Sequence, residues 1–482
     1  MTIGGPSLCF KTSSGIIRLA VMWTFRFTFS LRNAKKLLHG SVSKVVEDGF
    51  MIADCCGWSE LAGETRKFPE LRQRQTADLA IVGAGFTGLA AARRYGELKP
   101  EARILLIDAK RIGQGASARN SGFAVANESP GHSRLHTIEG LASYQTMNRL
   151  DHAGVEELRR LIALHNIQCQ WEDTGSIHAA HDPRNFDKLR HHVAAFKKLG
   201  VDAQLLEADV LQGRLGTSFY KLGVESRGGA LVQPAMLVKG LLESLPPNVE
   251  CYENTPVQSI EHAGKGWALS LPNGLVQATQ VIVSVNAVFP RLGFKSMRVF
   301  PLALTASLTR PLTEQEEAEI NQPPSWGILS PRSLGATMRL TKDRRILIRN
   351  TGEYRPSGIS LKMLAERRKL HADGLTKRFS FLNDSAIDYT WSGTIGISRN
   401  SKPVFEEAAP GLFLCGCYNA SGVSRGTIMG RLISDLTLGA SSSLLDDVLT
   451  LKKPNLIPPR PLFDPVAKVK LHLERSAALT ER

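Results

Sequence analysis

The stretch Asp78–Gly88, DLAIVGAGFTG, decides the fold expected for this chain of 482 residues. A short apolar run, Leu79–Val82, leads into the pattern G-x-G-x-x-G, and apolar residues then recur at helical spacing over Thr87–Leu98. A second apolar run follows at Ile104–Ile107. A strand, a glycine turn, a helix and a strand within about thirty residues predict a βαβ unit with parallel strands.

Each glycine of this pattern has its own physical role. Gly83 permits a tight turn, Gly85 lets the backbone approach a pyrophosphate, and Gly88 lets helix and strand pack closely. The N-terminus of the helix offers N–H groups to phosphate charge. Asp108, at the end of the second strand, can accept hydrogen bonds from ribose hydroxyls. In this context the pattern predicts dinucleotide binding, and the alternative is a glycine-rich turn without a ligand.

Further segments narrow the prediction to a flavin. A loop of small residues, GQGASARNSG at Gly113–Gly122, suits a second contact with phosphate. The segments AIVGAGFTGLAAA, LLIDAKRIGQGASARNSG, VIVSVNA and GLFLCGCYNASGVSRG occur in this order. Together they resemble the D-amino-acid oxidase-like FAD-dependent oxidoreductases, in the glycine and sarcosine oxidase group and most of all the γ-glutamylputrescine oxidoreductase type. The likeness runs from about residue 55 to residue 445.

The resemblance implies an α/β (α+β) fold in which a Rossmann-like FAD-binding domain carries an inserted, mixed-sheet substrate domain. We expect the FAD-binding domain to be discontinuous, over residues 51–165, 226–290 and 391–445. The substrate domain then takes residues 166–225 and 291–390. Residues 1–50 form an N-terminal extension outside the fold, and the Pro-rich residues 446–482 form an extended, wrapping tail.

The resemblance also implies which residues hold FAD. The glycines of the first turn contact its pyrophosphate, Asp108 its adenosine ribose, and the backbone of Val257 its adenine. The helix that begins after Gly422 points its N-terminus at the pyrimidine edge of the flavin, where reduced flavin carries negative charge. The complete expected set is Gly83, Gly85, Phe86, Thr87, Gly88, Asp108, Ala109, Gly115, Ala116, Ser117, Arg119, Asn120, Ser121, Val257, Asn286, Gly393, Gly422 and Val423.

The chain departs from the family pattern at two places. Cys417–Gly422 has no histidine where many members have one, so the role of that residue is absent here or filled differently. Sarcosine-oxidase-like members attach flavin through a cysteine, but the matching stretch Thr390–Gly393 has none. We therefore expect FAD to be bound non-covalently.

The activity implied is oxidation of the C–N bond of an amine or amino acid by hydride transfer to flavin N5, giving an imine that hydrolyses. Oxygen or another acceptor then takes the electrons. Arg339, on a predicted strand, is the catalytic candidate, because it could hold a substrate carboxylate or stabilise reduced oxygen. The alternative for Arg339 is a surface arginine among Lys342, Arg344 and Arg345. Alternative activities are a nicotinamide-dependent dehydrogenase and a flavoprotein that acts on RNA.

The net charge of +15 suggests a polyanion partner until its distribution is considered. Residues 1–46 hold seven Lys or Arg and no acidic residue, residues 446–482 hold +2, and the body of the chain holds only +6. We therefore expect no nucleic-acid partner. The apolar run Gly15–Leu31 is interrupted by Arg18 and Arg26, so we expect no membrane span, although a targeting segment stays an alternative to a plain extension.

Cysteines and histidines offer weaker signals. Seven sparse cysteines predict neither a disulfide framework nor a zinc site and favour the cytoplasm. Cys415 and Cys417 could form a redox pair, although buried thiols are the simpler interpretation. The histidines near residue 185 lie among basic residues, which indicates a solvated helix rather than a metal site; they are His178, His181, His191 and His192. Trp326 and Tyr354 are expected in the core rather than in a pocket.

Overall fold

The computed structural model describes residues 45–47, 50–52, 54–127, 129–130, 135 and 137–482. The extension expected at residues 1–50, including Gly15–Leu31, lies almost wholly outside these residues. Within the described part, no helix is long and apolar enough to cross a membrane.

The predicted βαβ unit is present and forms the centre of one sheet. The strands of this sheet are ordered β10-β4-β3-β13-β12-β11, and β20 pairs with β13 and with β19. The pairs among β10, β4, β3, β13 and β20 are parallel. The bounds are β3 Arg74–Val82, β4 Ile104–Ile107, β10 Val249–Tyr252, β11 Ser259–Ala263, β12 Gly266–Leu271, β13 Gly274–Val283, β19 Val404–Ala409 and β20 Leu412–Gly416.

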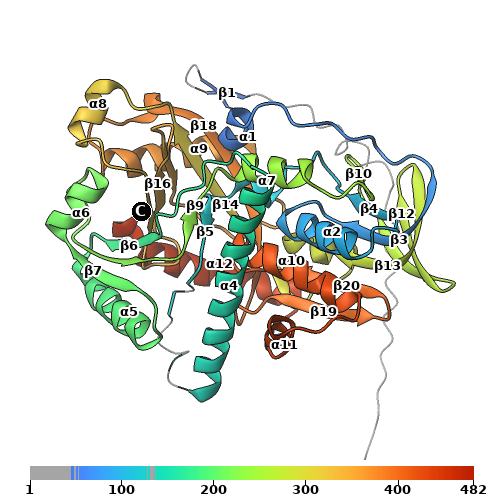
Figure 1. The fold of residues 1–482 in the computed structure, drawn as a ribbon. Helices are drawn as coiled ribbons and strands as arrows, with labels where there is room; N and C mark the ends of the chain where they lie inside the picture. Colours follow the sequence, from blue (N-terminus) through green and yellow to red (C-terminus); the bar gives the residue numbers. More distant parts are fainter. Residues whose placement is uncertain (1–44, 48–49, 53, 128, 131–134, 136) are drawn as a thin grey trace, which may run out of the picture. The chain divides into compact units, whose positions relative to one another are not determined.

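Both faces of this sheet are buried, which explains its continuous apolar runs. Leu79 and Ile81 of β3 face one apolar cluster, and Ala80 and Val82 face another. Helices cover the first face, and Figure 1 shows α2, α4 and α10 on the same side of the sheet. Their bounds are α2 Phe86–Leu98, α4 Ile138–Leu164, α7 Pro234–Glu243 and α10 Ser424–Thr437.

Glycines allow these helices to lie unusually close together. A Cβ at Gly430 of α10 would lie 2.3 Å from the Thr87 carbonyl oxygen of α2. A Cβ at Gly154 of α4 would lie 2.1 Å from the Ser424 carbonyl oxygen of α10. Backbone therefore meets backbone at both contacts, and the N-terminal ends of α2 and α10 come to lie side by side (Figure 1).

A second, mixed sheet takes residues from two separate parts of the chain. Its order is β18-β14-β17-β16-β15-β6-β8-β7, and within it β15 and β6 are parallel. The strands are β6 Ser176–Ala180, β7 Ala203–Glu207, β8 Leu222–Ser226, β14 Val299–Thr309, β15 Trp326–Leu329, β16 Thr337–Leu340, β17 Ile346–Arg349 and β18 Ile387–Ser398. Its helices are α5 Phe186–Lys198, α6 Ala208–Leu215, α8 Glu314–Glu319 and α9 Leu361–Thr376.

Two segments differ from the expectation. Residues 391–398, assigned to the FAD-binding domain, belong to β18, which pairs along its length with β14 of the second sheet. The tail is not extended throughout, because α11 (Ser443–Leu449) and α12 (Arg460–Ala477) are helices. Pro461 is compatible with a helix because it lies in the first turn, where its missing N–H has no partner to lose.

The remaining elements are short. They are β1 Val45–Glu47, β2 Phe50–Ile52, α1 Gly57–Leu61, α3 Ala116–Arg119, β5 Phe123–Ala124, β9 Ala230–Leu231 and the 3-10 turns Pro183–Asn185, Asn286–Leu292, Asp384–Ala386 and Leu479–Glu481.

The packing of α10 on α2 gives a testable prediction. Gly430→Ala should lower the free energy of unfolding by about 1–3 kcal/mol, because the added methyl group must displace backbone. Gly213→Ala is the matched control: Gly213 is helical and exposed, with open space at its Cβ position, so this change should stabilise by up to about 1 kcal/mol. Urea denaturation of both variants measures the difference, and equal effects would contradict the close approach.

Candidate active site

The first glycine turn has the geometry that its sequence predicts. Gly83 has a φ of +102°, and its N–H donates to the Ile107 carbonyl over 2.8 Å. A Cβ at Gly88 would lie 1.8 Å from the Gly83 carbonyl oxygen, so only glycine fits there. The Ser284 hydroxyl, which the sequence analysis did not single out, donates to the Gly83 carbonyl over 2.9 Å and braces the turn from β13.

The second loop meets the first turn directly. A Cβ at Gly85 would lie 2.6 Å from Ser117 Oγ, and this hydroxyl accepts a hydrogen bond from the Phe86 N–H over 3.0 Å. Gly115 caps α3, which begins at Ala116. The N-termini of α2 and α3 and two glycine-rich segments therefore converge, and backbone N–H groups arranged in this way can bind phosphate.

Asp108 lies at the end of β4 and joins three parts of the site. Its carboxylate accepts hydrogen bonds from the Ala84 and Lys110 N–H groups, both over 2.9 Å. Its carbonyl accepts from the Thr255 N–H over 2.9 Å, which places the segment containing Val257 beside it. Burial raises the pKa of the Asp108 carboxyl, and these two backbone donors oppose the rise. Ala109, the next expected residue, is exposed.

Aromatic and acidic residues that sequence reasoning missed hold the Gly113–Gly122 loop in place. The indole N–H of Trp58 donates to the Asn120 carbonyl over 2.8 Å, and that of Trp391 donates to the Arg119 carbonyl over 3.0 Å. The Arg119 side chain donates to the Ser392 carbonyl over 2.7 Å and pairs with Asp54. Arg119 thus ties the loop to β18 through its side chain.

Other expected residues of this loop serve its internal structure. The Asn120 side chain donates to the Ser117 carbonyl over 2.6 Å and accepts from the Gly122 N–H over 2.8 Å. A Cβ at Gly393 of β18 would lie 4.0 Å from the Arg119 Cβ, so the second sheet contacts this loop.

The late glycine and serine segment forms a strained turn between β20 and α10. Cys417, Asn419 and Ala420 all have positive φ, at 60°, 52° and 82°, a combination that is costly for residues other than glycine. Asn286 accepts a hydrogen bond from the Cys417 N–H over 3.1 Å and so links the end of β13 to this turn. Gly422 and Val423 follow and lead into α10.

The start of α10 is fixed by buried polar contacts. The Tyr418 hydroxyl contacts Thr87 Oγ1 of α2 over 2.6 Å. The Arg425 guanidinium donates to both carboxylate oxygens of Asp151 on α4, over 2.9 and 2.5 Å, and both side chains are almost fully buried. Arg425 lies within the family-like segment, but nothing in the sequence pointed to its partner Asp151.

The two cysteines beside this turn, Cys415 and Cys417, are both buried. Burial raises the pKa of both thiols to about 12, which leaves little of the reactive thiolate. Both are free thiols. The Cys415 thiol contacts the Met429 carbonyl at 3.5 Å, while Cys417 interacts with Ser398.

Arg339 is a buried residue, and the surface alternative for it is wrong. It lies on β16 and is fully buried, whereas Lys342 in the following turn is exposed. One terminal nitrogen, Nη1, donates to the Val232 carbonyl over 2.6 Å, and the guanidinium lies 5.2 Å from the centre of the Trp58 ring. A Cβ at Gly122 would lie 2.2 Å from Nη1, so Arg339 adjoins the Gly113–Gly122 loop.

The other edge of this guanidinium is unusual. Nε and Nη2, which form one edge of the planar group, have no hydrogen-bond partner in the described part of the chain. Burial lowers the pKa of Arg339 to about 10, against the opposing effect of the nearby Glu172 carboxylate. One oxygen of Glu172, Oε2, is also buried without a partner among the described residues. A buried polar group without a hydrogen-bond partner is unusual, because its burial is costly.

The remaining sequence candidates lie outside this site. The described residues contain no group of three or more His, Cys, Asp or Glu placed to hold a metal ion. The expected solvated histidine helix is only partly correct, because His192 is buried and its ring lies 4.7 Å from that of the buried His178. Trp326 and Tyr354 are buried, and Trp326 belongs to the core of the second sheet.

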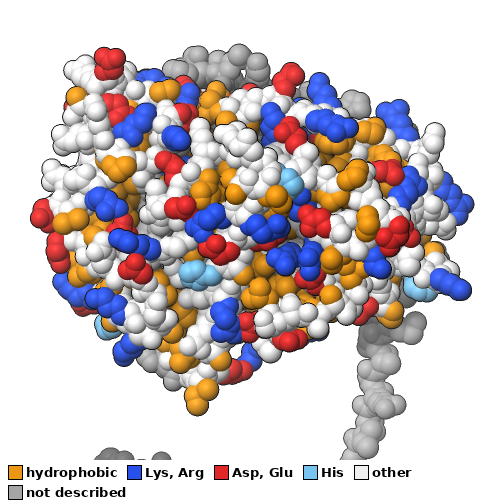
Figure 2. Space-filling model, viewed as in Figure 1, with side chains coloured by type: hydrophobic (Ala, Val, Ile, Leu, Met, Phe, Trp, Pro, Cys, Tyr) orange, Lys and Arg blue, Asp and Glu red, His pale blue; other side chains and the backbone are white. Residues whose placement is uncertain are grey.

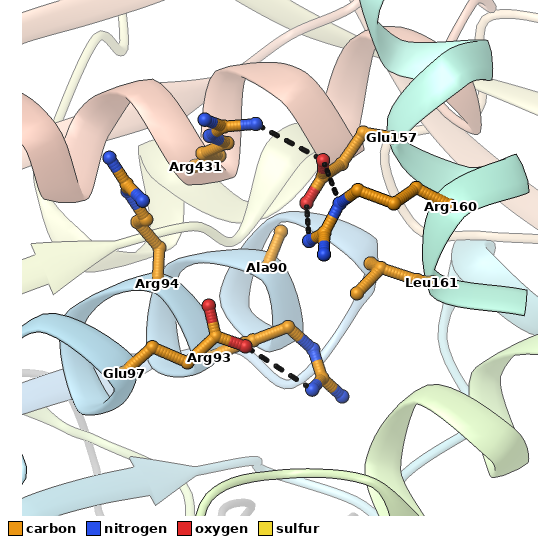
Figure 3. Close-up of a pocket in the computed structure, with 8 residues that line it drawn as sticks. All are labelled: Ala90, Arg93, Arg94, Glu97, Glu157, Arg160, Leu161 and Arg431. Carbon is orange, nitrogen blue, oxygen red and sulfur yellow. Dashed lines mark hydrogen bonds and ion pairs between the residues drawn. The ribbon is translucent and has the colours of Figure 1, made fainter. Parts of the chain in front are cut away.

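A pocket of about 300 Å³ lies between α2, α4 and α10, at the end of α2 opposite to the glycine turn (Figure 3). Its charged side chains are four arginines and two glutamates, and several of them are paired. Glu157 accepts hydrogen bonds from Arg160 over 2.8 Å and from Arg431 over 3.1 Å, and Arg93 pairs with Glu97 at 3.6 Å. We interpret this pocket as an ion-paired groove that joins three helices.

The converging turns and the parallel sheet behind them have the form of a dinucleotide-binding fold. The chain belongs to the DAO family of FAD dependent oxidoreductases, whose model matches residues 78–436. The predicted family and fold class and the FAD cofactor are thereby confirmed, and the nicotinamide alternative is not favoured.

Relatives of known name are similar over most of the chain. The chain is 26% identical over 384 residues to a probable oxidoreductase, OrdL, of Rhizobium meliloti, which covers 78% of this chain and 86% of the relative. It is 26% identical to the gamma-glutamylputrescine oxidoreductase of Escherichia coli, with coverage of 78% and 87%. The glycine oxidase structure from Geobacillus kaustophilus is similar in fold, with a TM-score of 0.61, 20% identity and coverage of 77% and 96%.

The buried ion pair of Asp151 and Arg425 gives a second prediction. Asp151→Asn should lower the free energy of unfolding by about 3–5 kcal/mol, because it leaves the Arg425 charge buried and unbalanced. Asp447→Asn is the control, since Asp447 pairs with the half-exposed Arg149 and should cost about 0–1 kcal/mol. Denaturation at saturating FAD measures the free energy of unfolding of both variants. Similar decreases would show that the buried ion pair contributes no more to stability than the exposed one.

Proposed function

We propose that this protein oxidises the C–N bond of an amine or amino acid. The carbon next to nitrogen loses a hydride and the nitrogen loses a proton, so that an imine forms; one water then hydrolyses the imine to a carbonyl compound and an amine or ammonia. Bound FAD supplies this chemistry, because its N5 atom accepts the hydride. If the amine arrives unprotonated, the reaction needs no strong general base. The names of the relatives, which include an oxidoreductase of gamma-glutamylputrescine and a glycine oxidase, support this substrate class.

The residues around the two loops fit an extended cofactor. Gly85 and Gly88 leave no room for side chains at the first turn, and Ser117 faces that turn from α3. We propose that these loops hold the pyrophosphate, that Asp108 binds the adenosine ribose, and that the start of α10 at Gly422 and Val423 faces the flavin. The expected set of cofactor residues as a whole remains part of this proposal.

The observation that carries the substrate proposal is the free edge of Arg339. Nε and Nη2 form a planar fork that matches the two oxygens of a carboxylate. The fork is buried, adjoins Gly122 of the cofactor loop, and has the charge of Glu172 nearby. A substrate with a carboxylate for Arg339 and an amine toward Glu172 would satisfy both orphaned groups. The proposed substrate is therefore an amine that carries a carboxylate.

The location of the enzyme, its electron acceptor and its domain division are also part of the proposal. We propose a cytoplasmic enzyme that passes electrons to oxygen or another acceptor and does not bind nucleic acid. The mild charge of the body supports this, and Figure 2 shows acidic side chains interspersed among the basic ones on the face it draws. We retain the proposed division into a discontinuous FAD-binding domain and an inserted substrate domain, with β18 moved to the second sheet.

Arg339 provides the direct test of the substrate class. Arg339→Met should lower kcat/KM for a carboxylate-bearing amine by about 10- to 100-fold, mainly through KM, because a charge-assisted hydrogen bond contributes about 1.5–3 kcal/mol. Arg339→Lys should recover only part of the loss, because lysine lacks the fork. Lys342→Met, in the exposed turn of the same hairpin, is the control and should leave kcat/KM unchanged.

The comparison substrate is an amine without a carboxylate. If Arg339→Met lowers kcat/KM equally for both substrates while flavin content and melting temperature stay normal, Arg339 does not bind a carboxylate. An anaerobic screen of amines, γ-glutamylated amines and amino acids tests the wider proposal, because any true substrate bleaches the flavin. Bleaching by none of these classes would refute amine oxidation, and the speed of recolouring in air distinguishes an oxidase from a dehydrogenase.

The mode of FAD attachment is tested separately. Since residues 390–393 contain no cysteine and the thiols of Cys415 and Cys417 are buried with raised pKa values, acid precipitation should release all flavin into the supernatant. The absorption spectra of pellet and supernatant measure the partition. Flavin that stays with the protein pellet would overturn the expectation of non-covalent binding.

A further inference from the structure

The tail helix α12 exposes an ordered row of large apolar side chains. Leu462, Val466, Val469 and Leu473 are each 60–68% exposed. Leu456 and Leu479, near the two ends of the helix, are similarly exposed. Scattered apolar residues on a surface are normal, but a continuous apolar row on one helix indicates a covered face. We name these four helical residues the α12 stripe.

Other side chains of α12 fix the helix to the body of the protein. The Phe463 ring lies 4.9 Å from the ring of Phe300 and 5.6 Å from that of Tyr354. The Tyr354 hydroxyl donates to Asp464 over 2.7 Å, and Ala467 is buried. These contacts set the rotation of the helix, so the α12 stripe faces outward as a consequence of ordered packing.

The spacing of the α12 stripe is that of a coiled-coil seam. Its members are separated by four, three and four residues, which is the a/d spacing of a heptad. An interfacial membrane helix instead has a broad apolar face that includes aromatic side chains. Here the aromatic residue of the helix, Phe463, packs inward, and two valines stand at the centre of the stripe. The pattern therefore favours a second helix over a lipid surface.

The order of residues in the α12 stripe identifies that helix. Leu, Val, Val and Leu at intervals of four, three and four read the same in both directions. A twofold axis between Val466 and Val469 would place Leu462 against Leu473 of a second copy, and Val466 against Val469 of that copy. Such self-complementarity is what an isologous dimer contact requires.

The residues that flank the α12 stripe permit this contact. In the heptad that the stripe defines, the positions beside the seam (e and g) are Phe463, Pro465, Lys470 and His472. Only Lys470 among them carries a formal charge when histidine is neutral. Pairing would therefore remove little charge from water. A stable interface buries about 800 Å² on each partner. We expect the α12 stripe to form the apolar centre of such an interface, and Leu456 and Leu479 to extend it at the ends of the helix.

We propose that two copies of this chain associate through antiparallel pairing of their α12 helices along the α12 stripe. The proposal is independent of the substrate, because α12 packs on the second sheet through Phe300 and Tyr354 and none of its contacts named here involves the glycine loops.

The test is the oligomeric state of the flavin-loaded, full-length protein, measured by sedimentation and by light scattering over a range of concentrations. The unchanged protein should be a dimer. The double variant with Val466→Glu and Val469→Glu should raise the dissociation constant at least 100-fold, because acidic groups then face each other. Val210→Glu, at an exposed apolar site on α6, is the control and should stay dimeric.

A charge swap tests the antiparallel register itself. The double variant with Val466→Lys and Val469→Glu should dimerise much better than the Glu/Glu variant, because each lysine would face a glutamate of the other copy. A parallel pairing would instead bring lysine to lysine and glutamate to glutamate. Normal flavin spectra and melting temperatures in all variants exclude misfolding as the cause.

Three results would overturn the proposal. The first is an unchanged protein that is monomeric at every concentration. The second is a dimer that is indifferent to the Glu/Glu change. The third is a monomer that sediments with phosphatidylserine vesicles through the same residues, which would make the α12 stripe a membrane contact.

Discussion

The constraint on which the structure depends is the contact of two glycines, Gly83 and Gly88, at the first turn. With only 1.8 Å from the Gly83 carbonyl oxygen to a Cβ at position 88, α2 can lie against the sheet only without a side chain there. The same solution is repeated outward, because Gly430 lets α10 lie on α2 and Gly154 lets α4 lie on α10. Because backbone contacts backbone where these helices pack, the N-terminal ends of α2 and α10 meet at the candidate site.

The parts of the fold that could be predicted from sequence are those whose signals are local. The unit from Leu79 to Ile107 lies within about thirty residues, and its apolar runs are continuous because both faces of the sheet are covered. The glycine pattern also predicts the backbone positions that only glycine can occupy. The family-like segments likewise have an order along the chain that a reader can recognise without knowing any contact.

The parts that could not be predicted depend on partners distant in sequence. Arg339 is close to several charged residues and looks exposed, but its burial comes from Trp58 and from the Val232 carbonyl, more than a hundred residues away. Asp151 is an ordinary acidic residue of a long helix until α10 brings Arg425 to it. The tail misled for another reason: its prolines suggested an extended chain, although Pro461 lies where a helix tolerates proline.

The 3-10 turn Leu479–Glu481 joins segments that are far apart along the chain. The Glu481 carboxylate accepts hydrogen bonds from the His181 and Asp182 N–H groups and from the Asn185 side chain, about 300 positions earlier. Its carbonyl accepts one from Arg378. The two backbone N–H groups that these contacts satisfy follow β6, an inner strand of the second sheet. Because contacts between residues so far apart in sequence form slowly, we expect this end of β6 to gain its partners late in folding.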